Sequence, residues 1–300
     1  MFRLTCLESA ESVIVKIVRK SEDPFWEHHL RREHWLLRLL ERFWQGGSPR
    51  PVAVGINRAW GFLAMEDLQA PSLAELASSL PRESLSGAIA LGLQILASLH
   101  GALAEHDAVF RRVIASIHLD EVTEEALRAR FCVALSRLFR LDDRSGTAIW
   151  ERGGRLHESL LTEPLQIIHN SCVPLNVLVD QRAWVIDWET AAVGALEWDL
   201  ADLVFFPPFS LSLEDTLEIV RSAYDRPWNE QRLLLAALLR SLDYAASTEA
   251  RAARSSDPQG EEHQRSLAYL RQARDLALHF GWREVVELAN VPAADTRAAE

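Results

Sequence analysis

The segment 169–189 constrains the fold of this 300-residue chain more than any other stretch. Polar residues at its start, ending with Asn176, precede a short apolar run, and a turn at 180–182 leads to a second apolar run that ends at Asp187. Two short apolar runs joined by a polar turn predict a β-hairpin over residues 176–187. The polar side chains at both ends of this hairpin are the first candidates for a functional site.

The pattern of the remaining chain changes near Pro71, from mixed strands and helix to mostly helix. Before Pro71, β-branched runs and one apolar helical face predict strands at 2–7 and 12–19, a helix at 24–44, and strands near 52–56 and 60–65. After it, the periodicity predicts helices at roughly 72–79, 83–106, 122–140, 147–162, 197–205, 213–225, 229–246 and 261–290, with a loop at 248–262.

Composition narrows the class of protein. A formal net charge of −11 argues against nucleic acid as a partner, because phosphate binding favours a basic surface. The cysteines Cys6, Cys132 and Cys172 have no metal-ligand spacing and favour a reduced, cytoplasmic protein. The apolar stretch 89–104 is interrupted by glycine, serine and histidine, so we expect a buried core helix and no membrane partner.

The loop and hairpin resemble the catalytic loop of the aminoglycoside phosphotransferase and choline kinase family, which has His-Gly-Asp, four residues, Asn, a short strand and a second Asp. His169, Asn176 and Asp187 stand at three of these positions. The segment 194–201 is similar to the family's Gly-Asp-Pro-x-x-Asp-Leu-Ala, with Asp199 as an expected structural anchor of the loop. His100, in a helix end that also resembles the family, is expected to be structural.

The resemblance implies an α+β fold of the bilobal protein-kinase type. It places a small, sheet-rich N-terminal lobe at residues 1–68 and a larger helical lobe at 69–300, which carries the loop and hairpin 169–189. The small lobe is expected to be truncated and to lack a glycine-rich loop, because the first glycine of the chain is Gly46.

The resemblance also implies roles for individual residues. Lys16, in the middle of a β-branched strand, is the expected phosphate-binding lysine, and Glu33 on the next helix is its expected partner. Glu66 lies in a segment similar to the family's adenine-binding hinge. If nucleotide and Mg²⁺ still bind, these three residues would line the nucleotide site, and Asn176 and Asp187 would hold the metal.

Two departures from the family argue against phosphoryl transfer. Ser171 stands where the family has the carboxylate that receives the proton of the acceptor hydroxyl, and a serine cannot act as that base. The predicted turn Glu8–Glu11 carries two carboxylates where the family covers the phosphates with a glycine-bearing turn. ATP binding is therefore doubtful and no cofactor is required, unless the true N-terminus begins further upstream.

The chain is accordingly interpreted as a pseudokinase. Family members of this kind resemble candidates for natural-product tailoring, in which a cysteine-derived thiol or enethiol adds to a dehydroamino acid of a ribosomally made peptide. Asp187 or His169 would be the base, and Lys16, Asn176 or Ser171 the hydrogen-bond donors. Two alternatives remain open: an active small-molecule phosphotransferase that uses ATP and Mg²⁺, and a non-enzymatic scaffold for a leader peptide or a partner enzyme.

Overall fold

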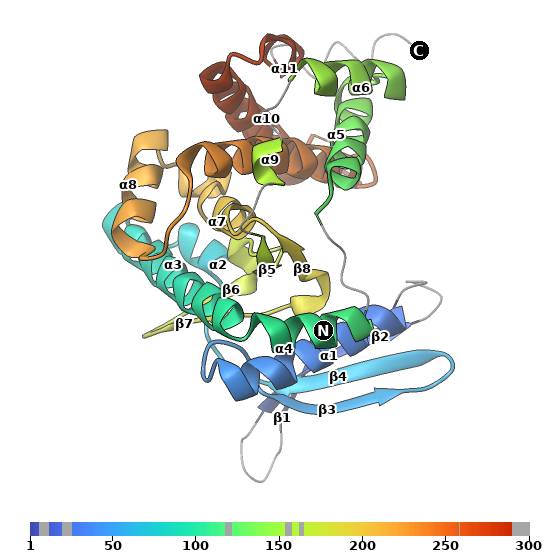
Figure 1. The fold of residues 1–300 in the computed structure, drawn as a ribbon, viewed down its shortest axis with the longest axis vertical. Helices are drawn as coiled ribbons and strands as arrows, with labels where there is room; N and C mark the ends of the chain where they lie inside the picture. Colours follow the sequence, from blue (N-terminus) through green and yellow to red (C-terminus); the bar gives the residue numbers. More distant parts are fainter. Residues whose placement is uncertain are drawn as a thin grey trace. The chain divides into compact units, whose positions relative to one another are not determined.

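The computed structural model describes residues 1–5, 12–19, 26–117, 122–153, 158–161, 165–257 and 259–289 (Figure 1). Its contacts group the chain into two compact units. Unit 1 comprises 1–121, 166–204 and 212–226, and unit 2 comprises 122–165, 205–211 and 227–300. The mixture of small antiparallel sheets with many helices confirms the α+β class. The division into lobes at residues 1–68 and 69–300 stays a prediction.

The largest sheet of unit 1 has four strands, all antiparallel, in the order β1-β2-β4-β3. These strands are β1 (Phe2–Thr5), β2 (Ser12–Arg19), β3 (Pro51–Ile56) and β4 (Trp60–Glu66). The register places Arg3 opposite Ile14 and Ile14 opposite Met65, so these three side chains leave the sheet on one face. Lys16, two residues after Ile14, lies on the same face.

Helix α1 (Trp26–Phe43) packs against β2, β3 and β4 of this sheet. Its fully buried side chains recur at helical spacing, as in Leu30, Leu37 and Leu40. Glu33 falls on the same stripe and is therefore carried into the interior. The helix thus brings a carboxylate to the face of the sheet that holds Lys16.

The rest of unit 1 combines helices with two small antiparallel sheets. The hairpin predicted over 176–187 is confirmed: β6 (Val177–Val179) pairs with β7 (Ala183–Val185). A second pair, β5 (Gln166–Ile168) with β8 (Ala192–Gly194), was not predicted, because its short strands are far apart in the chain and no local turn joins them. The helices are α2 (Leu73–Ala77), α3 (Arg82–Glu105), α4 (Asp107–Ile117), α7 (Glu197–Val204) and α8 (Leu213–Ala223).

Helix α3 is long and apolar enough to cross a membrane, the only such helix in the part of the chain that the structure describes. More than half of its most apolar window is buried inside the protein, including Ile89, Leu93 and Leu96. This burial is what a core helix of a soluble protein shows. A cytoplasmic location stays a prediction.

Unit 2 is helical, and its helices α9 (Glu230–Ala252) and α10 (Glu261–Phe280) pack along each other. The predicted loop 248–262 is too long at both ends, because α9 continues to Ala252, with Thr248 buried and its hydroxyl bonded to backbone carbonyls, and α10 begins at Glu261. The predicted helix 147–162 is wrong at both ends. Helix α6 begins at Asp143 and ends at Arg152. The other elements are α5 (Glu124–Phe139), η4 (Pro207–Phe209) and α11 (Arg283–Ala289).

Candidate functional site

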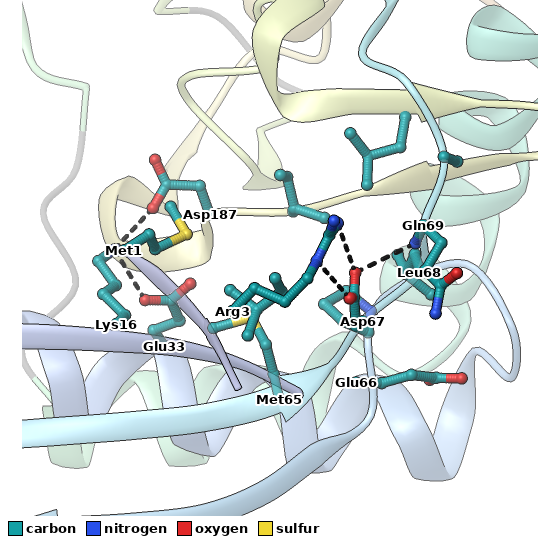
Figure 2. A pocket seen from close by; sticks show the side chains of 15 residues that line it. Met1, Arg3, Lys16, Glu33, Met65, Glu66, Asp67, Leu68, Gln69 and Asp187 are labelled. Carbon is teal, nitrogen blue, oxygen red and sulfur yellow. Dashed lines mark hydrogen bonds and ion pairs between the residues drawn. The ribbon is translucent and has the colours of Figure 1, made fainter. Parts of the chain in front are cut away.

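Lys16 lies among three carboxylates in unit 1. Its Nζ atom is 3.0 Å from Glu33 Oε2, 2.7 Å from Asp187 Oδ1 and 2.6 Å from Glu189 Oε2. The pairing of Lys16 with Glu33 predicted from sequence is confirmed, and Figure 2 shows Lys16, Glu33 and Asp187 directed toward one another. Glu189 was not predicted, although it is part of the Asp-Trp-Glu motif that ends the hairpin.

Local structure places each of these groups. Lys16 alternates with Val15, which is buried on the opposite face of β2. Asp187 follows β7 in a left-handed conformation (φ 66°), which aspartate adopts more readily than most residues. The next three residues form the 3₁₀ turn η3 (Trp188–Thr190), in which Trp188 is buried and Glu189 is directed back to Lys16.

Burial and the neighbouring charges shift the pKa values of Lys16 and Glu33 within this cluster. Burial alone would lower the pKa of Lys16, but attraction to Glu33, Asp187 and Glu189 outweighs it and holds the pKa above its usual value. Burial raises the pKa of Glu33 to about 7, and the neighbouring Lys16 offsets only part of this effect. The second carboxylate oxygen of Glu33, Oε1, is buried and has no hydrogen-bond partner among the described residues.

The same carboxylates are a potential cation site. One oxygen from each of Glu33, Asp187 and Glu189 lies within 4.8 Å of the others, and carboxylate oxygens are the ligands that Mg²⁺ prefers. The Lys16 ammonium bonds to these three residues, so it already supplies a positive charge at this point. A metal ion held by all three would have to displace Lys16.

The loop before the hairpin is held by Asp199. Its carboxylate accepts hydrogen bonds from the backbone N–H groups of His169 and Asn170, at 2.8 Å each. Its Oδ2 atom also lies 3.0 Å from His100 Nε2. This confirms Asp199 as the structural anchor of the loop. His100 is structural too, because its two ring nitrogens contact the side chains of Asp199 and Tyr224 in the interior.

Asn170 stands at the family's glycine position and has φ 62°. The left-handed conformation favours glycine, and asparagine is one of the few other residues that adopt it readily. The Asn170 side chain also donates to the carbonyl of Thr190 at 3.1 Å. The loop backbone is therefore maintained without the glycine.

The predicted loop residues lie in different environments. His169 is fully buried, with Nε2 bonded to the Ile186 carbonyl at 2.9 Å. Burial lowers the pKa of its imidazole. Asn176 donates from Nδ2 to the carbonyl of Ser171 at 2.9 Å, and its own carbonyl accepts from the N–H of Ile186, the residue before Asp187. Asn176 is thereby brought to the start of the Asp187 turn.

Cys172 carries no chemistry in this arrangement. Its side chain is fully buried, and burial raises the pKa of the thiol well above its usual value. A thiol held in this neutral form is a poor nucleophile.

A pocket of about 210 Å³ opens beside the Lys16 cluster, within unit 1 (Figure 2). Four residues of the segment 63–68 that resembles the hinge line it, namely Met65, Glu66, Asp67 and Leu68, so hinge residues and Lys16 share one cavity. Arg3 also lines it and was not predicted. The full lining is Met1, Arg3, Ile14, Lys16, Glu33, Pro49, Met65, Glu66, Asp67, Leu68, Gln69, Ala70, Leu178, Ile186 and Asp187.

The residues present fit a nucleotide with its metal in part. The ion pair of Lys16 with Glu33 is suitable for phosphate, and the apolar pocket is suitable for a base. Asn176 and Asp187 carry suitable groups for Mg²⁺. The acceptor side does not fit, because Ser171 has no carboxylate. The predicted turn Glu8–Glu11 lies outside the described residues.

Comparison with known proteins supports the kinase-like fold. The structure is similar to choline kinase LicA from Streptococcus pneumoniae (18% identity, TM-score 0.61, covering 90% of this chain and 87% of that chain). It is also similar to an aminoglycoside 3′-phosphotransferase of type VIII (19%, 0.53, 80% and 87%) and to a putative fructosamine-3-kinase from Haemophilus somnus 129PT (15%, 0.53, 90% and 85%). At these identities the similarity shows the fold alone.

A search of curated proteins found no significant match. The profile of the phosphotransferase enzyme family, APH, matches residues 7–232, which is most of the chain. The chain therefore belongs to the phosphotransferase enzyme family.

Proposed function

We propose that this member of the family no longer transfers phosphate efficiently and uses the cleft beside Lys16 for another reaction. The observation that carries the proposal is Ser171, which stands between the backbone held by Asp199 and the metal-ligand candidate Asn176. A carboxylate at that place would accept the proton of an acceptor hydroxyl. Loss of a general base typically lowers the rate by a factor of about 10² to 10⁴.

The remaining groups support addition chemistry that needs no ATP. Asp187 is about a quarter exposed and Lys16 is bonded to it, so a carboxylate and an ammonium face the same cleft. This pair can accept a proton and stabilise a developing negative charge. His169 is fully buried, so the proposal assigns the base to Asp187 and leaves His169 as a structural residue.

The proposed reaction closes a thioether ring in a ribosomally made peptide. A cysteine-derived thiol or enethiol gives its proton to Asp187, and its sulfur bonds to the β-carbon of a dehydroamino acid. The alkene electrons move onto the neighbouring carbonyl oxygen, where Lys16 stabilises the enolate, and the α-carbon then takes up the proton from Asp187, which restores the carboxylate. No oxidant, reductant or metal is consumed, and holding sulfur and alkene together supplies much of the acceleration.

The test uses a peptide with one dehydroalanine and one cysteine. Ring closure leaves its mass unchanged and removes the free thiol, so the alkylated fraction measured with iodoacetamide should fall faster with protein than without. The variant Asp187→Asn should lose most of this acceleration, while Asp180→Asn, in the exposed hairpin turn, should keep it. Equal rates with and without the native protein would reject the cyclisation proposal.

Conversion of ATP with Mg²⁺ is the second candidate, favoured by the intact ion pair between Lys16 and Glu33 and by the position of Asp187. Restoring the carboxylate separates the two candidates. If the native protein has lost phosphoryl transfer, Ser171→Asp should raise phosphate release from Mg·ATP on the order of a hundredfold over the native protein. Ser171→Ala should not raise it. If the native protein already transfers phosphate to a small acceptor as fast as Ser171→Asp, the loss of phosphoryl transfer is disproved.

A further inference from the structure

An ion pair between β1 and the end of β4 lies at the edge of the pocket. Arg3 Nε is 2.6 Å from Asp67 Oδ2, and Arg3 Nη2 is 3.1 Å from Asp67 Oδ1. Two parallel N–H donors thus meet the two oxygens of one carboxylate. The Arg3 side chain is 59% exposed and the Asp67 side chain only 3%, so the guanidinium covers the carboxylate and remains open to solvent itself.

The orientation of Asp67 is fixed independently of Arg3. Its Oδ2 accepts a hydrogen bond from the Ser12 hydroxyl at 2.7 Å, and its Oδ1 accepts one from the N–H of Gln69 at 3.3 Å. Burial alone would raise the pKa of Asp67, but the hydrogen bonds from Ser12, Arg3 and Gln69 outweigh it and lower the pKa. The contacts with Ser12 and Gln69 therefore keep the Asp67 carboxylate oriented toward whatever occupies the place of Arg3.

The pocket next to this carboxylate is suited to a flat ring. Ile14 and Met65 contribute apolar side chains from the sheet, and Leu178 and Ile186 contribute them from the hairpin. A volume of about 210 Å³ is below the roughly 300–1,000 Å³ of pockets that enclose whole drug-sized ligands. It matches one planar group, while the Lys16 ammonium lines the same pocket.

We propose that this pocket selects a guanine nucleotide, that Asp67 is the residue which sets the base preference, and that Arg3 is a built-in substitute for the base. The guanidinium of Arg3 and the N1–H and N2–H₂ edge of guanine present the same chemistry, two adjacent donors in one plane. Lys16 is the cation available to the phosphates of that nucleotide.

Adenine does not match this carboxylate. Its corresponding edge offers one donor, N6–H₂, beside the lone pair of N1, so one Asp67 oxygen would face an acceptor and both groups would lose a hydrogen bond. A good two-donor contact is worth on the order of a tenfold to hundredfold preference over the wrong base. We expect this preference for GDP over ADP.

The inference concerns binding and does not depend on which reaction the cleft performs. If the cleft closes thioether rings, GDP should inhibit ring closure, because both the nucleotide and the proposed enolate use Lys16. Inactive protein in the ring-closure assay would leave the binding preference intact, so the two proposals fail separately.

Calorimetric titration of the full chain with GDP and with ADP, in the presence and absence of Mg²⁺, tests the inference. Arg3→Ala should bind GDP about twofold to fivefold more tightly than the native protein, since the exposed ion pair that competes with the base is removed. Arg58→Ala, which removes an exposed positive charge in the β3–β4 turn, should change nothing.

Asp67→Asn should abolish the preference, because the amide presents one acceptor and one donor in place of two acceptors. Thermal unfolding confirms that each variant is folded, and Arg3→Ala keeps the test available if Asp67→Asn does not fold. The inference would be overturned if the native protein and Arg3→Ala each bound GDP and ADP with equal affinity. It would also be overturned if neither protein bound GDP. The inference would also be overturned if N-acetylarginine methylamide bound at Asp67 and GDP did not bind.

Discussion

Glu33 and Asp199 are both almost completely buried carboxylates of unit 1, and they have opposite properties. Asp199 is bonded by two backbone N–H groups and the His100 imidazole, and despite its burial these contacts lower its pKa. Glu33 has Lys16 as its hydrogen-bond donor and one oxygen without a partner among the described residues, and its pKa is raised to about 7. The number of donors, more than the depth of burial, decides which carboxylate stays ionised.

The largest effect is expected from Asp199→Ala. This change leaves two backbone N–H groups and His100 without their acceptor in the interior, so the free energy of unfolding should fall by about 3–5 kcal/mol. Urea denaturation followed by circular dichroism measures it, with the exposed Asp180→Ala as a control that should change stability little. A loss below about 1 kcal/mol would mean that Asp199 does not hold the loop as the contacts indicate.

The next effect is a pH dependence that belongs to Glu33. Its pKa rises from 4.5 unfolded to about 7 folded, so the folded state binds the extra proton between these values. Stability from Glu33 should therefore be present below pH 4.5 and decline as pH rises to 7, by up to about 3 kcal/mol. Burial alone would raise the pKa of Asp199, but the contacts with His100 and with the His169 backbone outweigh it and lower the pKa. The contribution of Asp199 therefore has the opposite sign and is lost only in acid.

Comparing native protein with Glu33→Gln across pH 4.5–8 isolates this contribution, because all other titrating groups are common to both. The difference in unfolding free energy should shift in favour of Glu33→Gln as pH rises. A difference that stays flat with pH would show that Lys16 keeps Glu33 ionised throughout, which would remove the contrast with Asp199.

The smallest effect is expected where Asp199 holds the loop through Asn170. Asn170→Gly restores the family's residue at a left-handed position and should change stability by only a few tenths of a kcal/mol, since it gains backbone freedom and loses the bond to Thr190. Asn170→Ala should cost about 1 kcal/mol, because alanine adopts this conformation poorly. Thermal unfolding of both variants gives the comparison, and equal melting temperatures would argue against backbone strain at this position.

Much of the structure around the site could be predicted from sequence because it depends on local patterns. The hairpin follows from two apolar runs about a turn, and the contact of Lys16 with Glu33 follows from a central strand position and a helical stripe. Asp199 was identifiable as an anchor because its segment resembles the family's. None of these inferences needed the tertiary structure.

Other parts of the site could not be predicted because they depend on contacts across the sheet. Arg3 and Asp67 are 64 residues apart and meet only through the pairing of β1 with β2 and of β2 with β4. The burial of His169 depends on packing against Trp188, at 4.6 Å between ring centroids, which no local pattern reveals. Helix ends in unit 2 were misplaced for the same reason, since buried contacts such as those of Thr248 extend α9 beyond its apolar pattern.

The three carboxylates around Lys16 also determine how the protein behaves toward amine reagents. The sequence has two lysines, Lys16 and Lys20, and the first is held as an ammonium ion with almost no free amine at neutral pH. Acylating labels, amine-coupled sensor chips and lysine cross-linkers should therefore leave Lys16 unmodified. Amine coupling that spares Lys16 would leave its ion pairs with Glu33, Asp187 and Glu189 intact.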